Sequence, residues 1–112
     1  MQDALISALR YLPLLALAAL LEVGGDAGMR AGLQGRRGGF ALGAALLVAY
    51  GIVVNLPNWE FGRLLGVYIA VFFLVSQVMA VLAFHEKLKA PTLVGGALIV
   101  TGGLVLALWH PK

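Results

Sequence analysis

Four long apolar stretches alternate with short polar breaks along this chain of 112 residues. Each stretch is close to the roughly 20 residues that a helix needs to cross the hydrocarbon core of a bilayer. The breaks hold most of the charged residues, together with glycines and prolines that end helices. The pattern predicts one four-helix membrane domain over residues 1–112, with helices at about 4–31, 40–56, 61–84 and 91–109.

The composition supports this interpretation. Hydrophobic residues make up 62% of the chain and charged residues only 12%, whereas charged residues make up about 25% of an ordinary soluble domain. We therefore expect an all-α integral membrane protein that crosses the cell inner (plasma) membrane several times. The net charge of +3 is typical of loops anchored at a membrane surface, so the lipid bilayer is an expected partner and nucleic acid is not.

Several kinds of chemistry have no basis in the sequence. The chain has no cysteine, which excludes disulfides and thiolate metal sites. His85 and Glu86 stand next to each other once, without a second ligand pair at metal spacing, so we expect no metal. No nucleophile triad, phosphate loop or nucleotide fingerprint occurs, so we expect neither an enzyme nor a cofactor.

Four spans would place both chain ends on one side of the membrane. The basic residues then divide five against three, which is a weak bias by the positive-inside rule and permits insertion in both orientations. One side would carry Arg30, Arg36, Arg37, Lys87 and Lys89, and the other Arg10, Arg63 and Lys112.

Two acids lie inside the first apolar stretch. A carboxylate at membrane depth costs about 2.5 kcal/mol or more, so Glu22 and Asp26 are candidates for function. Helical spacing places them on one stripe with mostly small residues, where a ligand would have room or where another helix would pack closely. This stripe contains Ala18, Ala19, Glu22, Gly25, Asp26 and Met29.

The two acids need not have the same role. Asp26 precedes Arg30 by four residues, which is the orientation that favours an ion pair within a helix. Glu22 would then remain without a local partner, free to exchange a proton or bind a cation. Alternatively, both acids face one cavity and share a dication or a polyamine. Tyr68 lies deep enough to line that cavity, whereas Tyr50 reads as an interfacial anchor.

The last apolar stretch carries glycines seven residues apart. Small residues in such a stripe let another helix backbone approach closely, either from a second subunit or within the same one. We expect a dimer interface at Gly95, Gly96, Gly102 and Gly103.

These features resemble the small multidrug resistance family within the drug/metabolite transporter superfamily. In the first stretch, the resemblance rests on Leu21-Glu22-Val23 followed by Gly25 and Arg30. At the end of the chain it rests on Phe84-His85-Glu86-Lys87-Leu88, then Pro91, Gly95, Leu98-Ile99 and Gly102. Gly62-Arg63 with Tyr68 looks more like the YnfA-like branch than like the multidrug pumps.

The resemblance implies an antiparallel, dual-topology homodimer in which two copies of Glu22 meet and bind either protons or a cation. We therefore expect a proton-coupled exporter of small or lipophilic cations that works by alternating access. Three positions depart from the pumps: Asp26 replaces a small or hydroxyl residue, Tyr68 replaces a tryptophan, and residues 69–71 replace a glycine-containing hinge.

Two other functions stay open. The chain could be a non-transporting partner subunit whose acids only contact a different polypeptide. It could also be a lipid-carrier flippase subunit, in which Arg30 or Arg63 would bind an anionic headgroup and Glu22 would matter little.

Overall fold

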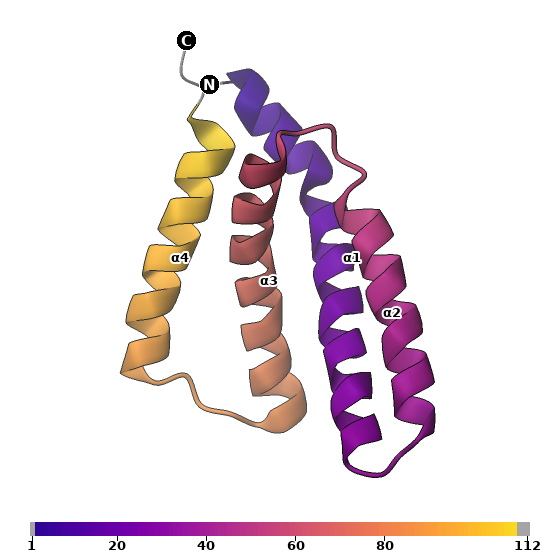
Figure 1. The fold of residues 1–112 in the computed structure, drawn as a ribbon. Coiled ribbons are helices and arrows are strands. Elements are labelled where there is room, and N and C mark those ends of the chain that lie inside the picture. The colour runs from indigo at the N-terminus through magenta and orange to yellow at the C-terminus, as the bar shows by residue number, and fades with distance from the viewer. Residues whose placement is uncertain (1, 110–112) are drawn as a thin grey trace.

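The computed structural model describes residues 2–109, and within this range it contains four helices and no strand (Figure 1). The prediction of an all-helical fold with four helices is confirmed. Lys112, assigned above to one side of the membrane, lies outside the described residues. The helices are α1 (Gln2–Leu33), α2 (Gly38–Val54), α3 (Phe61–Phe84) and α4 (Ala90–Leu108).

Three of the helices are long and apolar enough to cross a membrane. These are α1, α3 and α4, with 32, 24 and 19 residues. The remaining helix, α2, is also apolar but has 17 residues, which is the lower limit for a span. The protein therefore has the helices of a multi-pass membrane protein.

The end of α2 is set by a polar side chain. The helix stops at Val54, two residues before its predicted end, because Asn55 leaves helical geometry with φ −95° and ψ 3°. Its Nδ2 donates a hydrogen bond of 2.7 Å back to the carbonyl oxygen of Gly51. Asparagine commonly competes with helix continuation in this way, and Pro57 follows two residues later.

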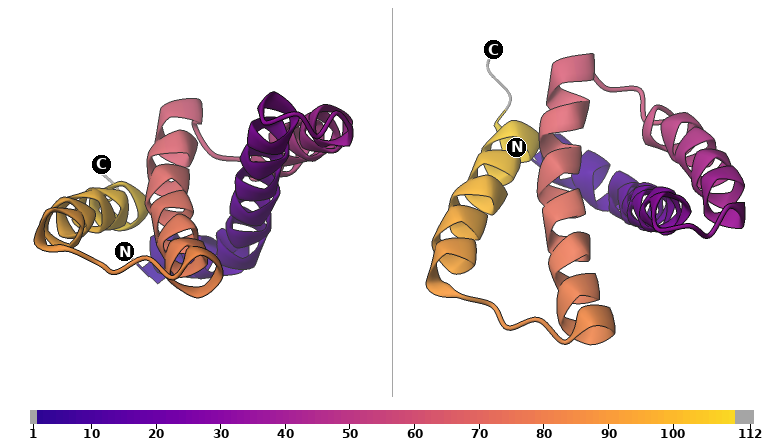
Figure 2. Two further views of the ribbon diagram at one scale, coloured as in Figure 1. Left: turned by 90° about the horizontal axis from the view of Figure 1, so that it is seen from below. Right: turned by 60° about the horizontal axis from the view of Figure 1, so that its bottom comes forward.

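Pro13 lies inside α1, since the helix begins at Gln2. A proline in a helix interior removes one backbone hydrogen bond and its ring crowds the preceding turn, which bends the helix. Figure 2 shows this bend in the N-terminal half of α1. The bend turns the first part of α1 towards α3 and α4.

The helices form an open row instead of a closed bundle. Across the molecule the order is α4, α3, α1, α2 (Figure 1), with Cα extents of 52 × 34 × 18 Å. Large apolar side chains of all four helices remain exposed, such as Leu20, Val48, Leu82 and Leu98, so much of the surface of the row is uncovered. The buried core lies where α1 crosses α3, with contributions from α2 and α4. It consists of Leu15, Ala18, Ala19, Val54, Leu64, Val67, Tyr68, Val71 and Ala107.

Glycines bring α1 and α2 into backbone contact. A Cβ atom added to Gly28 would lie 2.9 Å from the Cα of Gly43. A Cβ atom added to Gly43 would lie 2.8 Å from the carbonyl oxygen of Gly25. Helices that cross this closely gain van der Waals contact along their backbones, which is the main source of helix association in lipid.

Arg63 joins three helices at the end of the molecule where α1 begins and α4 ends. Its Nε and Nη2 atoms donate to the carbonyl oxygens of Leu106 and Ala107, each at 3.0 Å, and so satisfy free acceptors at the end of α4. Its guanidinium lies 4.6 Å from the ring centre of Trp59. Trp59 in turn donates from Nε1 to the Ser7 hydroxyl in α1 at 2.9 Å.

The close crossing of α1 and α2 predicts opposite effects for two glycine substitutions in α2. Gly43→Ala should lower the melting temperature of the purified protein by about 5 °C or more, because overpacking a tight contact costs about 1–3 kcal/mol. Gly51→Ala should leave it unchanged or raise it, because the added methyl group meets no other described helix or side chain within 4 Å and alanine favours the helix. Equal melting temperatures for the two variants, measured in the same detergent, would contradict this packing.

Candidate functional site

The central feature of the site is a hydrogen bond between Glu22 of α1 and Tyr68 of α3. The Tyr68 hydroxyl donates to Oε1 of Glu22 at 2.6 Å, a distance typical of a donor to a charged acceptor. Tyr68 is only 4% exposed and belongs to the core, whereas Glu22 is partly buried. The structure thus brings together two residues that the sequence singled out separately.

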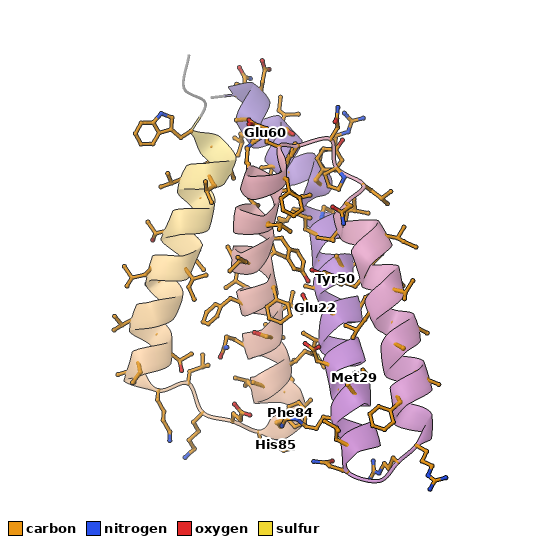
Figure 3. All side chains as sticks on the ribbon, viewed as in Figure 1. Glu22, Met29, Tyr50, Glu60, Phe84 and His85 are labelled. Atoms are coloured by element: carbon orange, nitrogen blue, oxygen red, sulfur yellow. The ribbon has the colours of Figure 1, made fainter. Side chains whose placement is uncertain are left out.

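Aromatic rings surround this hydrogen bond. The ring centres of Tyr50 and Tyr68 are 5.5 Å apart, and those of Tyr68 and Phe72 are 6.1 Å apart. Figure 3 shows Glu22 and Tyr50 near each other at about mid-height of the helices. Glu22, the three aromatic residues and two aliphatic residues line a pocket of about 250 Å³. Its lining consists of Glu22, Tyr50, Leu65, Tyr68, Ile69 and Phe72. We call this the Glu22 pocket.

The Glu22 pocket combines one acid with several ring faces. A carboxylate attracts a cation, and the negative face of an aromatic ring adds to that attraction when the cation lies over it. The pocket is also open, since Ile69 lines it and is 56% exposed. Its volume falls just below the range of about 300–1,000 Å³ that is usual for ligand pockets. The Glu22 pocket is thus small and open, with one acid and three aromatic rings in its lining.

Asp26 lines a different pocket from Glu22. Its exposed side chain faces a pocket of about 430 Å³ near the end of α1, and Arg30 and Arg36 line the same pocket. The predicted ion pair between Asp26 and Arg30 stays a prediction, with both side chains exposed beside one pocket. A cavity shared by the two acids, the alternative considered above, also stays a prediction.

The small residues predicted beside the acids contact other helices. Ala18 is fully buried in the core. Gly25 is also buried, and a Cβ atom added there would lie 2.6 Å from a terminal carbon of Leu47 in α2. The open space beside Glu22 is on its aromatic side, so the structure favours a packing role for Ala18 and Gly25.

The four glycines of the predicted dimer interface divide into two pairs. Gly96 packs against the ring of Phe73 and Gly103 against Ala70, both in α3 of the same chain. Apart from the adjoining residues and backbone of α4 itself, no described heavy atom lies within 4 Å of a Cβ atom added to Gly95 or Gly102. Gly96 and Gly103 therefore hold α4 against α3, and Gly95 and Gly102 remain on the outer face of α4.

The sequence did not identify two of the three aromatic residues of the Glu22 pocket. Tyr50 was interpreted as an interfacial anchor, yet its position well inside an apolar stretch is the same signal that marked Tyr68. Phe72 carries no polar atom, so nothing distinguishes it in the sequence from other apolar residues. Among residues 2–109 there is no group of three or more histidine, aspartate or glutamate side chains that could hold a metal ion.

The chain has relatives over almost its entire length. A UPF0060 membrane protein of Herpetosiphon aurantiacus is 34% identical over 104 residues, which are 89% of this chain and 94% of that protein. The chain belongs to the UPF0060 family of membrane proteins. UPF0060 membrane proteins of Streptomyces coelicolor and Rhodococcus jostii are 34% and 36% identical, over 93% and 88% of this chain and 95% and 93% of their own lengths.

Membership of the UPF0060 family agrees with the likeness to the YnfA-like branch. It establishes a membrane protein and gives no activity, because the relatives' names say no more than that. No protein-family model matches the chain. No solved structure matches it either.

The hydrogen bond to Glu22 predicts a difference between two tyrosine variants of this UPF0060 protein. Tyr68→Phe should increase labelling of Glu22 by a hydrophobic carbodiimide about fivefold, because the hydroxyl that occupies Oε1 is lost along with about 1 kcal/mol of interaction. Tyr50→Phe keeps that hydrogen bond and should label like the native protein. Mass spectrometry of the labelled peptide measures both, and equal labelling of the two variants would be inconsistent with the geometry described.

Proposed function

We propose that this UPF0060 protein is a proton-coupled transporter that exports small or lipophilic cations by alternating access. The observation that carries the proposal is the position of the Glu22 carboxylate in an apolar helix. It accepts a hydrogen bond of 2.6 Å from the Tyr68 hydroxyl, and it lines a pocket together with three aromatic rings. A membrane-embedded acid costs several kcal/mol and is seldom present without a function. The earlier resemblance to small multidrug resistance proteins supports the same assignment.

Competition at Glu22 provides the coupling. The carboxyl group can hold a proton or neutralise a bound cation, but one group does not do both at once. A site that alternates between the two sides of the membrane then exchanges protons for cations, because each ligand lowers the affinity for the other. Transport against a gradient needs no cofactor and no covalent chemistry.

The proposal includes an antiparallel homodimer in the bacterial inner membrane. A single chain leaves the Glu22 pocket open, since Ile69 in its lining is 56% exposed, and a second copy would cover it with its own Glu22. Gly95 and Gly102 on the outer face of α4 offer a surface where a helix of the partner can approach closely. The weak charge bias of the loops is compatible with both orientations.

The two acids lie in different surroundings, and those of Glu22 suit a cation better. Each chain contributes one carboxylate to the Glu22 pocket, while Asp26 faces a pocket that also contains two arginines. We therefore assign the cation to Glu22, Tyr68 and the rings around them.

Proton release on substrate binding tests this function. Adding tetraphenylphosphonium to the purified protein in weak buffer should release protons, because the cation displaces them from Glu22. Glu22→Gln should abolish the release. Asp26→Asn is the matched control, since it removes an acid one helical turn away that lines another pocket, and it should retain most of the release.

Release that persists in Glu22→Gln would refute the assignment of the shared carboxylate. Binding of the cation without any release in the native protein would refute proton coupling and favour a non-transporting partner subunit.

A further inference from the structure

The pocket that contains Asp26 has a polar end and an apolar end. Its polar lining comes from Arg30 in the last turn of α1 and from Gln34 and Arg36 in the following loop. Its apolar lining includes Val23 and Ala27, one to two turns deeper along α1. We call this the Arg30–Arg36 pocket.

The end of α3 closes the apolar part of this pocket. Phe84, the last residue of α3, lines the pocket while remaining 64% exposed. Figure 3 shows Phe84 between the end of α3 and the lower part of α1. A ligand here would meet an aromatic ring and small aliphatic side chains at one end and two guanidinium groups at the other.

The surroundings of the pocket are basic. Arg37 follows Arg36 in the loop, and Lys87 and Lys89 lie in the connection between α3 and α4 at the same end of the molecule. The acids in this region are Asp26 and Glu86. This excess of positive charge attracts anions from the surrounding solvent and from an anionic membrane surface.

We propose that the Arg30–Arg36 pocket binds the phosphodiester headgroup of an anionic phospholipid. Guanidinium groups match phosphate oxygens in geometry and charge, and Gln34 adds a further donor. The acyl chains would run along Val23, Ala27 and Phe84 towards the bilayer core. The site is separate from the Glu22 pocket, so it does not depend on the function proposed for Glu22.

The apolar half of the pocket favours a lipid over free phosphate. Inorganic phosphate would gain nothing from Val23, Ala27 or Phe84, whereas an amphiphile fits both halves at the depth where α1 leaves the membrane. Asp26 lies one helical turn before Arg30 in α1 and lines the same pocket. Its negative charge would repel the anionic headgroup. We infer that Asp26 weakens binding, so the lipid can exchange instead of being held permanently.

The test compares arginines that differ in position but not in charge. Affinity for dioleoylphosphatidylglycerol is measured on the purified full chain in detergent at about 0.5 M salt, where surface electrostatics beyond a few ångströms are screened. Arg30→Gln and Arg36→Gln should each lower the affinity about fivefold. Arg37→Gln is the matched control, because this neighbouring arginine does not line the pocket, and it should change the affinity less than about twofold.

Three further measurements, together with the comparison of Arg36 and Arg37, test the proposed lipid site. Asp26→Asn should raise the affinity for the anionic lipid, and a decrease would overturn the proposal by making the pocket a cation site. Dioleoylphosphatidylcholine should bind more weakly, and equal binding of the two lipids would overturn the requirement for net negative charge. Competition by millimolar inorganic phosphate would overturn the lipid site itself. An equal loss of lipid affinity in Arg36→Gln and Arg37→Gln would overturn it as well.

Discussion

The hydrogen bond between Tyr68 and Glu22 is the interaction on which the rest of the structure depends. An acid in the middle of an apolar helix needs a polar partner, and here that partner must come from another helix. Tyr68 reaches Glu22 because α3 crosses α1 over Ala18 and Ala19, which are fully buried and too small to keep the helices apart. The aromatic pocket and the crossing of α1 and α3 are thus parts of one arrangement.

The two ends of the helix row are held differently. At the end where α1 starts, Arg63 and Trp59 connect α1, α3 and α4 through directed hydrogen bonds and a cation–π contact. At the other end, α1 and the end of α3 are separated by the Arg30–Arg36 pocket. Among residues 2–109, the side-chain hydrogen bonds between helices thus lie at the end where α1 starts and, through Tyr68 and Glu22, near the middle of the row.

Much of this arrangement could be predicted from the sequence, and the remainder has a physical reason. Helix number and approximate bounds follow from apolar runs, and Glu22 and Tyr68 stand out as polar groups within such runs. The direction in which each side chain points could not be predicted, because helices that are apolar all round carry no periodic signal to mark the packed face. For this reason Gly25 could be read as space for a ligand although it contacts α2, and Tyr50 could be read as an anchor although it lines the Glu22 pocket.

The central claim is that one chain supplies half of a site and that two copies of Glu22 share one cation. The stoichiometry of binding tests this most directly. Calorimetric titration of the purified protein with tetraphenylphosphonium should reach saturation at one cation for every two chains, because in the proposed dimer a second copy would close the open side of the Glu22 pocket. Saturation at one cation per chain would contradict the account, since each Glu22 pocket would then bind its own ligand.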